Sequence, residues 1–151
     1  MRLLTRRKAL ALGAMSATAV LAGVHNGAQA ATADAAAEIA KFTGGKTPDS
    51  ARVTLELPEI AENGSAIALS VVVDSPMTPD NHVTDILVVA EGNPSPGVAA
   101  FKFTPMSGRA EVATRIRLAG SQNVVVVAKT NNGGVFTAQR QVKVTIGGCG
   151  G

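Results

Sequence analysis

The sequence contains few of the side chains on which most enzyme and metal sites depend. Its 151 residues include one cysteine, two histidines, four phenylalanines and no tryptophan or tyrosine. A zinc or copper site needs several His or Cys ligands, so these residue counts argue against a metalloprotein. Stacking of single-stranded nucleic acid needs aromatic platforms, and four phenylalanines as the only aromatic residues give little reason to expect it. One cysteine cannot form a disulfide within the chain, so the thiol is free, modified or bonded to another molecule.

The first thirty residues have the features of a secretory signal. A basic start is followed by an apolar stretch from Ala9 to Val24 and by the A-x-A sequence that ends at Ala30. We expect cleavage after Ala30 and a location in the periplasm. The paired arginines of Thr5–Leu10 resemble the twin-arginine signal, which exports folded proteins. The alternative is an ordinary secretory signal with two adjacent arginines.

Removal of this signal changes the charge of the protein. Four of the fourteen basic residues lie in it (Arg2, Arg6, Arg7 and Lys8), which leaves ten Lys and Arg against eleven Asp and Glu. A net charge of −1 gives no reason to expect nucleic-acid binding. No second apolar run is long enough to span a membrane, so we predict a soluble protein with no membrane contact. Residues 31–146 are expected to form one domain.

Short apolar segments separated by turn residues dominate the mature chain. A short helix is predicted over Asp34–Phe42, because helix formers there end at Gly44-Gly45. Seven candidate strands follow: Arg52–Leu57, Ile67–Val73, Val83–Ala90, Val98–Phe103, Ala110–Leu118, Val124–Lys129 and Val135–Ile146. This spacing predicts an all-β fold, an immunoglobulin-like antiparallel β-sandwich of about seven strands with a short N-terminal helix.

Two valine runs do not alternate with polar residues. They are Val71–Val73 and Val124–Val127. Such runs suit strands that are covered on both faces. The pattern leaves two alternatives open: a central strand of the sandwich, or a sheet face covered by a partner protein.

The cysteine lies in the C-terminal sequence Gly147-Gly148-Cys149-Gly150-Gly151. Four glycines offer no side chain to pack, so we expect residues 147–151 to form a flexible arm that adds nothing to the core. The nearest basic residues along the chain, Lys143 and Arg140, are six and nine positions upstream. Unless the arm folds back, we expect activation of the thiol by whichever enzyme the arm enters. Alternatives are an intermolecular disulfide in a homodimer and a structural cysteine.

Other titratable residues carry no clear signal. His82 follows the turn residues Pro79-Asp80-Asn81 and is interpreted as a loop residue. Glu59 with Glu62 and Asp80 with Asp85 lie among turn signals, so they are interpreted as solvated loop charges. The chain lacks the Walker A, GxGxxG and HExxH motifs. No catalytic residue and no metal ligand is predicted.

Several segments of the mature chain, the terminal motif above all, resemble the SoxY family, the sulfur-carrier subunits of the bacterial Sox thiosulfate-oxidising system. The similar segments are GGCGG at the end, LPEIAENG (57–64), SPM (75–77), GNPSPGVAAFKF (92–103) and TRIRLAGSQNVVVVAK (114–129). The resemblance implies covalent attachment of sulfur intermediates at Cys149, with Gly147, Gly148, Gly150 and Gly151 as the flexible arm. It also implies an immunoglobulin-like sandwich.

The resemblance further implies partners and cofactors. Family members form a heterodimer with the companion subunit SoxZ. The c-type haem enzyme SoxAX couples thiosulfate to the thiol, and the dimanganese hydrolase SoxB releases sulfate. Where it is present, a sulfane dehydrogenase oxidises the remaining sulfur. The chain itself is then a carrier without catalytic activity or cofactor, and haem and manganese belong to the partner enzymes. The alternative is a secreted structural or adhesion-type β-sandwich that is cross-linked through Cys149.

Overall fold

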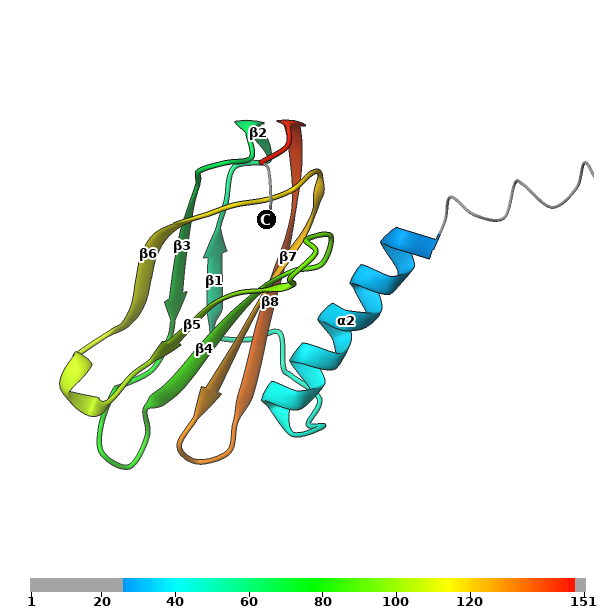
Figure 1. The fold of residues 1–151 in the computed structure, drawn as a ribbon. Coiled ribbons are helices and arrows are strands. Elements are labelled where there is room, and N and C mark those ends of the chain that lie inside the picture. The colour runs from blue at the N-terminus through cyan, green and yellow to red at the C-terminus, as the bar shows by residue number, and fades with distance from the viewer. Residues whose placement is uncertain (1–25, 149–151) are drawn as a thin grey trace, which may run out of the picture.

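The structure, a computed structural model, describes residues 26–148 as one helix packed on a β-sandwich (Figure 1). The predicted cleavage site at Ala30 lies within the helix, whereas most of the predicted signal and Cys149, Gly150 and Gly151 lie outside the described residues. In chain order the elements are α2 (Asn26–Thr43), β1 (Val53–Glu56), β2 (Ile60–Asn63), β3 (Ile67–Val73), β4 (Val83–Ala90), β5 (Gly97–Lys102), the 3-10 turn η1 (Pro105–Ser107), β6 (Ala110–Ile116), β7 (Gln122–Thr130) and β8 (Val135–Ile146).

The strands form two sheets that face each other across one core. One sheet has the strand order β1-β3-β6, and the other has the order β2-β8-β7-β4-β5. This arrangement confirms the predicted immunoglobulin-like sandwich. All strand pairs in these sheets are antiparallel except β2 with β8, which run parallel in the register Ile60 with Lys143.

The strand β2 is the element that the sequence pattern missed. Its residues fall between Pro58 and the turn at Asn63-Gly64, and only Ala61 of the four is buried. So short a segment shows no alternation from which a strand could be inferred. It raises the described strand count to eight and introduces the parallel pair, which corrects the expectation of a purely antiparallel sandwich.

The helix α2 is longer than predicted but ends where its glycines indicated. It begins at Asn26, and Gly44 and Gly45 follow its last residue with positive φ angles of 65° and 79°. The amide of Gly45 donates a hydrogen bond to the carbonyl of Ala40 (3.1 Å), which satisfies a free carbonyl at the helix end. Within residues 26–148 no helix has the length and apolar character needed to cross a membrane.

The helix covers the outer face of the five-stranded sheet, as Figure 1 shows. Along β7, Val124 and Val126 point into the core between the sheets, whereas Val125 and Val127 belong to a second apolar cluster beneath the helix. The other members of this second cluster are Ala35, Leu87, Val89 and Val135, with Ile39 and Phe42 packed against them. The run Val124–Val127 is therefore covered on both faces within the same chain. It gives no support for a partner surface.

Candidate functional site: the C-terminal tail contact

The last described residues of the chain are attached to the sandwich by backbone hydrogen bonds. The amide of Gly64 donates to the carbonyl of Ile146 (2.8 Å), and the amide of Leu118 donates to the carbonyl of Gly64 (2.8 Å). The amide of Gly148 donates in turn to the carbonyl of Leu118 (2.9 Å). We call this contact between residues 64, 117–119 and 147–148 the tail contact. It places the residue before Cys149 against the body of the domain.

Three glycines make this close approach possible. A Cβ on Gly64 would overlap the carbonyl oxygen of Leu118 and lie 2.7 Å from the amide nitrogen of Gly148. A Cβ on Gly147 would overlap the carbonyl oxygen of Ala119, and one on Gly148 would lie 2.8 Å from the carbonyl oxygen of Gly64. None of the three has a φ in the left-handed region. Glycine is needed here for space rather than for backbone conformation.

The structure thus differs from the expectation that the arm is free from Gly147 onward. Gly148 is buried, and both Gly147 and Gly148 contact the backbone of other segments. The physical reason is that a chain without side chains can pack backbone against backbone. The roles predicted for Cys149, Gly150 and Gly151 concern residues outside the described part of the chain and stay predictions.

Two buried amide side chains hold the segment that receives the tail. Asn93, only 1% exposed, donates from Nδ2 to the carbonyl of Arg117 and accepts from the amide of Ala119, both at 2.9 Å. Its Oδ1 also accepts from Nε2 of Gln122 (2.9 Å), and Gln122 accepts from the amide of Gly92 (2.7 Å). These bonds hold residues 117–119 in an irregular but ordered path after β6.

Sequence reasoning missed Gly64, Asn93, Arg117 and Gln122. Gly64 follows Asn63 and Asn93 precedes Pro94, and such pairs are typical of ordinary turns. The sequence does contain one signal, since the polar segment Gly120–Asn123 directly precedes the valine run Val124–Val127. A buried amide at such a position has to find partners, which points to a structured loop.

Arg117 is the basic residue that lies beside the tail. Its Cγ would be 2.8 Å from a Cβ on Gly148, so the stem of this side chain runs along the residue before Cys149. We expected basic residues to be distant from the tail because only their positions along the chain were considered. The fold instead brings Arg117 close to it. Arg140, one of the two residues then considered, donates to the carbonyl of Leu57 (3.3 Å).

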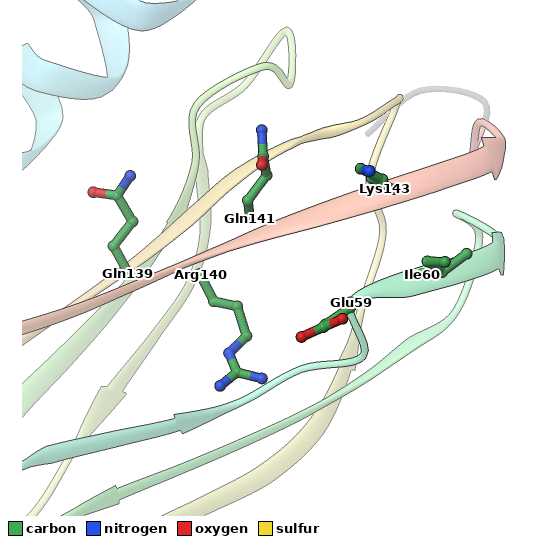
Figure 2. A pocket seen from close by; sticks show the side chains of 6 residues that line it. All are labelled: Glu59, Ile60, Gln139, Arg140, Gln141 and Lys143. Carbon is green, nitrogen blue, oxygen red and sulfur yellow. The ribbon is translucent and has the colours of Figure 1, made fainter.

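Arg140 lines a different hollow, formed by β8 and the chain around β2. Figure 2 shows Glu59 and Ile60 on one side and Gln139, Arg140, Gln141 and Lys143 along β8. The hollow is about 460 Å³ and contains neither cysteine nor histidine. Its glutamines and opposite charges indicate a solvated groove along the sheet edge rather than a reaction centre.

The remaining titratable candidates lie in loops or on strand surfaces. Nδ1 of His82 is 3.0 Å from the carbonyl of Thr78, within its own loop. Asp85 lies 4.0 Å from both Lys102 and Lys129. In the part of the chain that the structure describes, no three His, Cys, Asp or Glu side chains are grouped closely enough to hold a metal ion.

Comparison with known proteins identifies the family of this chain. The family model described as "Sulfur oxidation protein SoxY" matches residues 39–149, which is most of the chain and ends on the cysteine. The solved structure of the sulfur carrier protein SoxY from Chlorobium limicola f thiosulfatophilum is 34% identical, with a TM-score of 0.61. The match covers 76% of this chain and 98% of that protein. This chain belongs to the SoxY family.

Other solved structures share the SoxY-type sandwich at lower identity. A superoxide reductase (neelaredoxin) from Ignicoccus hospitalis is 21% identical with a TM-score of 0.55, over 61% of this chain and 79% of that protein. The superoxide reductase from Nanoarchaeum equitans is 12% identical with a TM-score of 0.53, over 64% of this chain and all of that protein. These similarities concern the fold alone. No curated protein sequence matches this chain.

Proposed function

We propose that this protein is a periplasmic carrier that holds thiosulfate-derived sulfur intermediates covalently on Cys149 and presents them to partner enzymes. The observation that carries the proposal is the family match, which extends through the sandwich to residue 149. Carriage of sulfur needs one accessible thiol. The sequence supplies one cysteine, and the fold places the residue before it at one end of the sandwich.

The chain acts as a carrier and leaves the catalysis to other proteins. The oxidative coupling of thiosulfate and the hydrolytic release of sulfate then belong to SoxAX and SoxB. A sulfane dehydrogenase acts on the remaining sulfur where it is present, and SoxZ forms the heterodimer with this chain.

The tail contact supports a specific version of this mechanism. Since Gly147 and Gly148 lie against the domain, these two residues can extend the arm toward an enzyme only when the contact opens. Opening costs one hydrogen bond and a few backbone contacts, which corresponds to about 1 kcal/mol. A partner enzyme can readily supply that much by binding the arm.

The test is intact-mass analysis of the protein and its Cys149→Ser variant. Both are purified from the periplasm of cells growing on thiosulfate, together with whatever companion subunit co-purifies. We expect mass increments of bound sulfur on the wild-type chain and none on the variant, with unchanged circular dichroism. Sulfur increments that persist on the variant would contradict the assignment of Cys149. A disulfide-linked homodimer as the sole modified form would favour the cross-linked structural protein instead.

A further inference from the structure

The strand β8 has an interrupted neighbour along its outer edge. The amide of Asp49 donates to the carbonyl of Val135 (2.9 Å), and the amide of Thr137 donates to the carbonyl of Asp49 (2.8 Å). Pairing resumes just before β2, where the amide of Lys143 donates to the carbonyl of Glu59 (2.9 Å). Between these two contacts the chain enters β1, which pairs with β3 in the other sheet. The edge of β8 is therefore open over about 20 Å, at roughly 3.3 Å per residue.

The open edge presents backbone groups that have no partner in the described chain. The register of β8 with β7 runs without a break over 135–142, so alternate residues of β8 point their N–H and C=O groups away from β7. Thr137 and Lys143 belong to this outward set, and Gln139 and Gln141 lie between them in the same set. Within residues 26–148 the backbone groups of these two glutamines make no hydrogen bond on the outward side. An unpaired edge of this kind is a template for another strand.

The side chains around this edge leave it accessible to solvent. Gln139, Arg140 and Gln141 are three consecutive exposed residues. Figure 2 shows the two glutamines on one side of β8 and Arg140 on the other, where its Nη1 donates to the carbonyl of Leu57 (3.3 Å). The hollow of about 460 Å³ described above lies along the same edge and is lined by all three exposed residues. An incoming chain can therefore reach the unpaired backbone groups.

We propose that this open edge binds an extended segment of another polypeptide, which adds a short strand to β8. The N–H and C=O groups of an extended peptide are the ligands that an unpaired strand edge recognises. A gap of this length admits a segment of about four to six residues. Among the charged side chains that line the hollow, Arg140 and Lys143 are basic and Glu59 is acidic, so the segment should carry acidic rather than basic side chains. This binding site goes beyond the proposed function and does not depend on sulfur chemistry.

A second copy of this chain does not fit the same gap. The β8 edge of that copy is flanked by its own Asp49 and Glu59 segments, which occupy the position of the next strand. If two such edges approached each other, these segments would collide before one β8 could pair with the other. In a two-fold pairing centred on Arg140, each arginine would also lie opposite its own copy, and like charges directly opposite each other are destabilising. The partner is therefore a different chain, with a terminus or loop that extends into the gap.

The test uses random heptapeptides displayed on phage and selected against the full-length protein with its thiol reduced. We expect peptides rich in Asp and Glu that, once resynthesised, protect the amides of Gln139 and Gln141 from hydrogen exchange. In Gln141→Pro one outward N–H is lost, and the affinity of these peptides should fall about tenfold or more. The variant should fold, because this N–H makes no bond within its own sheet.

The matched control is Ala100→Pro on β5, the edge strand at the other side of the same sheet. Ala100 is exposed, and its N–H also points away from the neighbouring strand, because the amide of Phe103 donates to Thr84 and N–H directions alternate along β5. This variant should keep the wild-type affinity for the selected peptides. An equal loss of affinity in both proline variants would overturn the assignment of the site to β8.

A second measurement does not require a proline variant to fold. A strand added to one edge uses every second N–H of the peptide, so N-methylation of one alternate set should weaken binding about tenfold or more, and methylation of the other set by less than about twofold. Equal effects of the two sets, unchanged binding to Gln141→Pro, or failure to select any peptide would overturn the proposal. A concentration-dependent dimer that is lost in Gln141→Pro would also overturn it, because the edge would then belong to a second copy.

Discussion

The helix and the C-terminal tail are attached to the same sandwich in opposite ways. The helix α2 is held by side chains, with Ala35, Ile39 and Phe42 packed on a valine-rich sheet face. The tail is held where side chains are missing, because Gly64, Gly147 and Gly148 let backbone groups meet directly. Apolar packing gives strong and permanent attachment, since each buried valine or leucine contributes about 1.5–3 kcal/mol. A backbone contact with few hydrogen bonds is weaker and reversible.

The largest loss of unfolding free energy should come from placing a charged side chain beneath the helix α2. Val127 is fully buried in the cluster under α2, so Val127→Asp puts an unpaired carboxylate there. We expect the free energy of unfolding to fall by about 3–5 kcal/mol, measured by denaturant titration of the mature chain. Thr145→Asp on the exposed part of β8 should change it by less than about 0.5 kcal/mol. Equal effects of the two variants would show that the helix does not cover this face in solution.

A smaller loss of unfolding free energy is expected when one methyl group is added to the tail contact. In Gly64→Ala the new Cβ would meet backbone atoms of Leu118 and Gly148, which cannot rotate away. The expected cost is about 1–3 kcal/mol of unfolding free energy. Gly120→Ala is the matched control, because a Cβ there meets nothing within 4 Å and its φ is also outside the left-handed region. If both alanines have the same effect, the close approach at Gly64 is absent in solution.

The smallest effect is predicted at the tail itself. Gly148→Ala adds a Cβ beside Arg117 and the carbonyl of Gly64, but the chain end can move away. We expect a loss of about 1 kcal/mol or less, the value of one hydrogen bond, measured as a small fall in thermal midpoint. Faster alkylation of Cys149 by a neutral reagent should accompany it. A variant as destabilised as Gly64→Ala would show that the tail is a permanent part of the fold.

The sequence pattern predicted the attachment of the helix through side chains far better than the attachment of the tail through backbone groups. The strands β3, β4 and β8 lie where the apolar segments indicated, and Gly44-Gly45 ends the helix as expected. The run Val124–Val127 predicted a strand that is covered on both faces, but it did not identify the segment that covers the outer face. The cover is α2, which lies more than 80 positions earlier in the chain.

The tail contact was not predicted, because the sequence does not distinguish a glycine in a turn from a glycine that allows two backbone segments to contact each other. Gly64 has the sequence context of a turn, and only the fold shows that Leu118 and Gly148 lie against it. The same holds for Arg117, which is far from Gly148 along the chain but lies beside it in the fold. The composition points to the lone cysteine, whose role stays a prediction.

The parallel pairing of β2 with β8 has a consequence for the order in which the protein folds. Ile60 and Ala61 pair with Lys143 and Val144, so this pairing joins the two ends of the strand region. Contacts between such distant segments require the closure of a long loop and slow the folding of the domain. We expect β7 and β8, which are consecutive and paired, to associate first and β2 to join last. The tail contact depends on Gly64, which follows β2, so Gly148 reaches its position beside Arg117 only when the domain is complete.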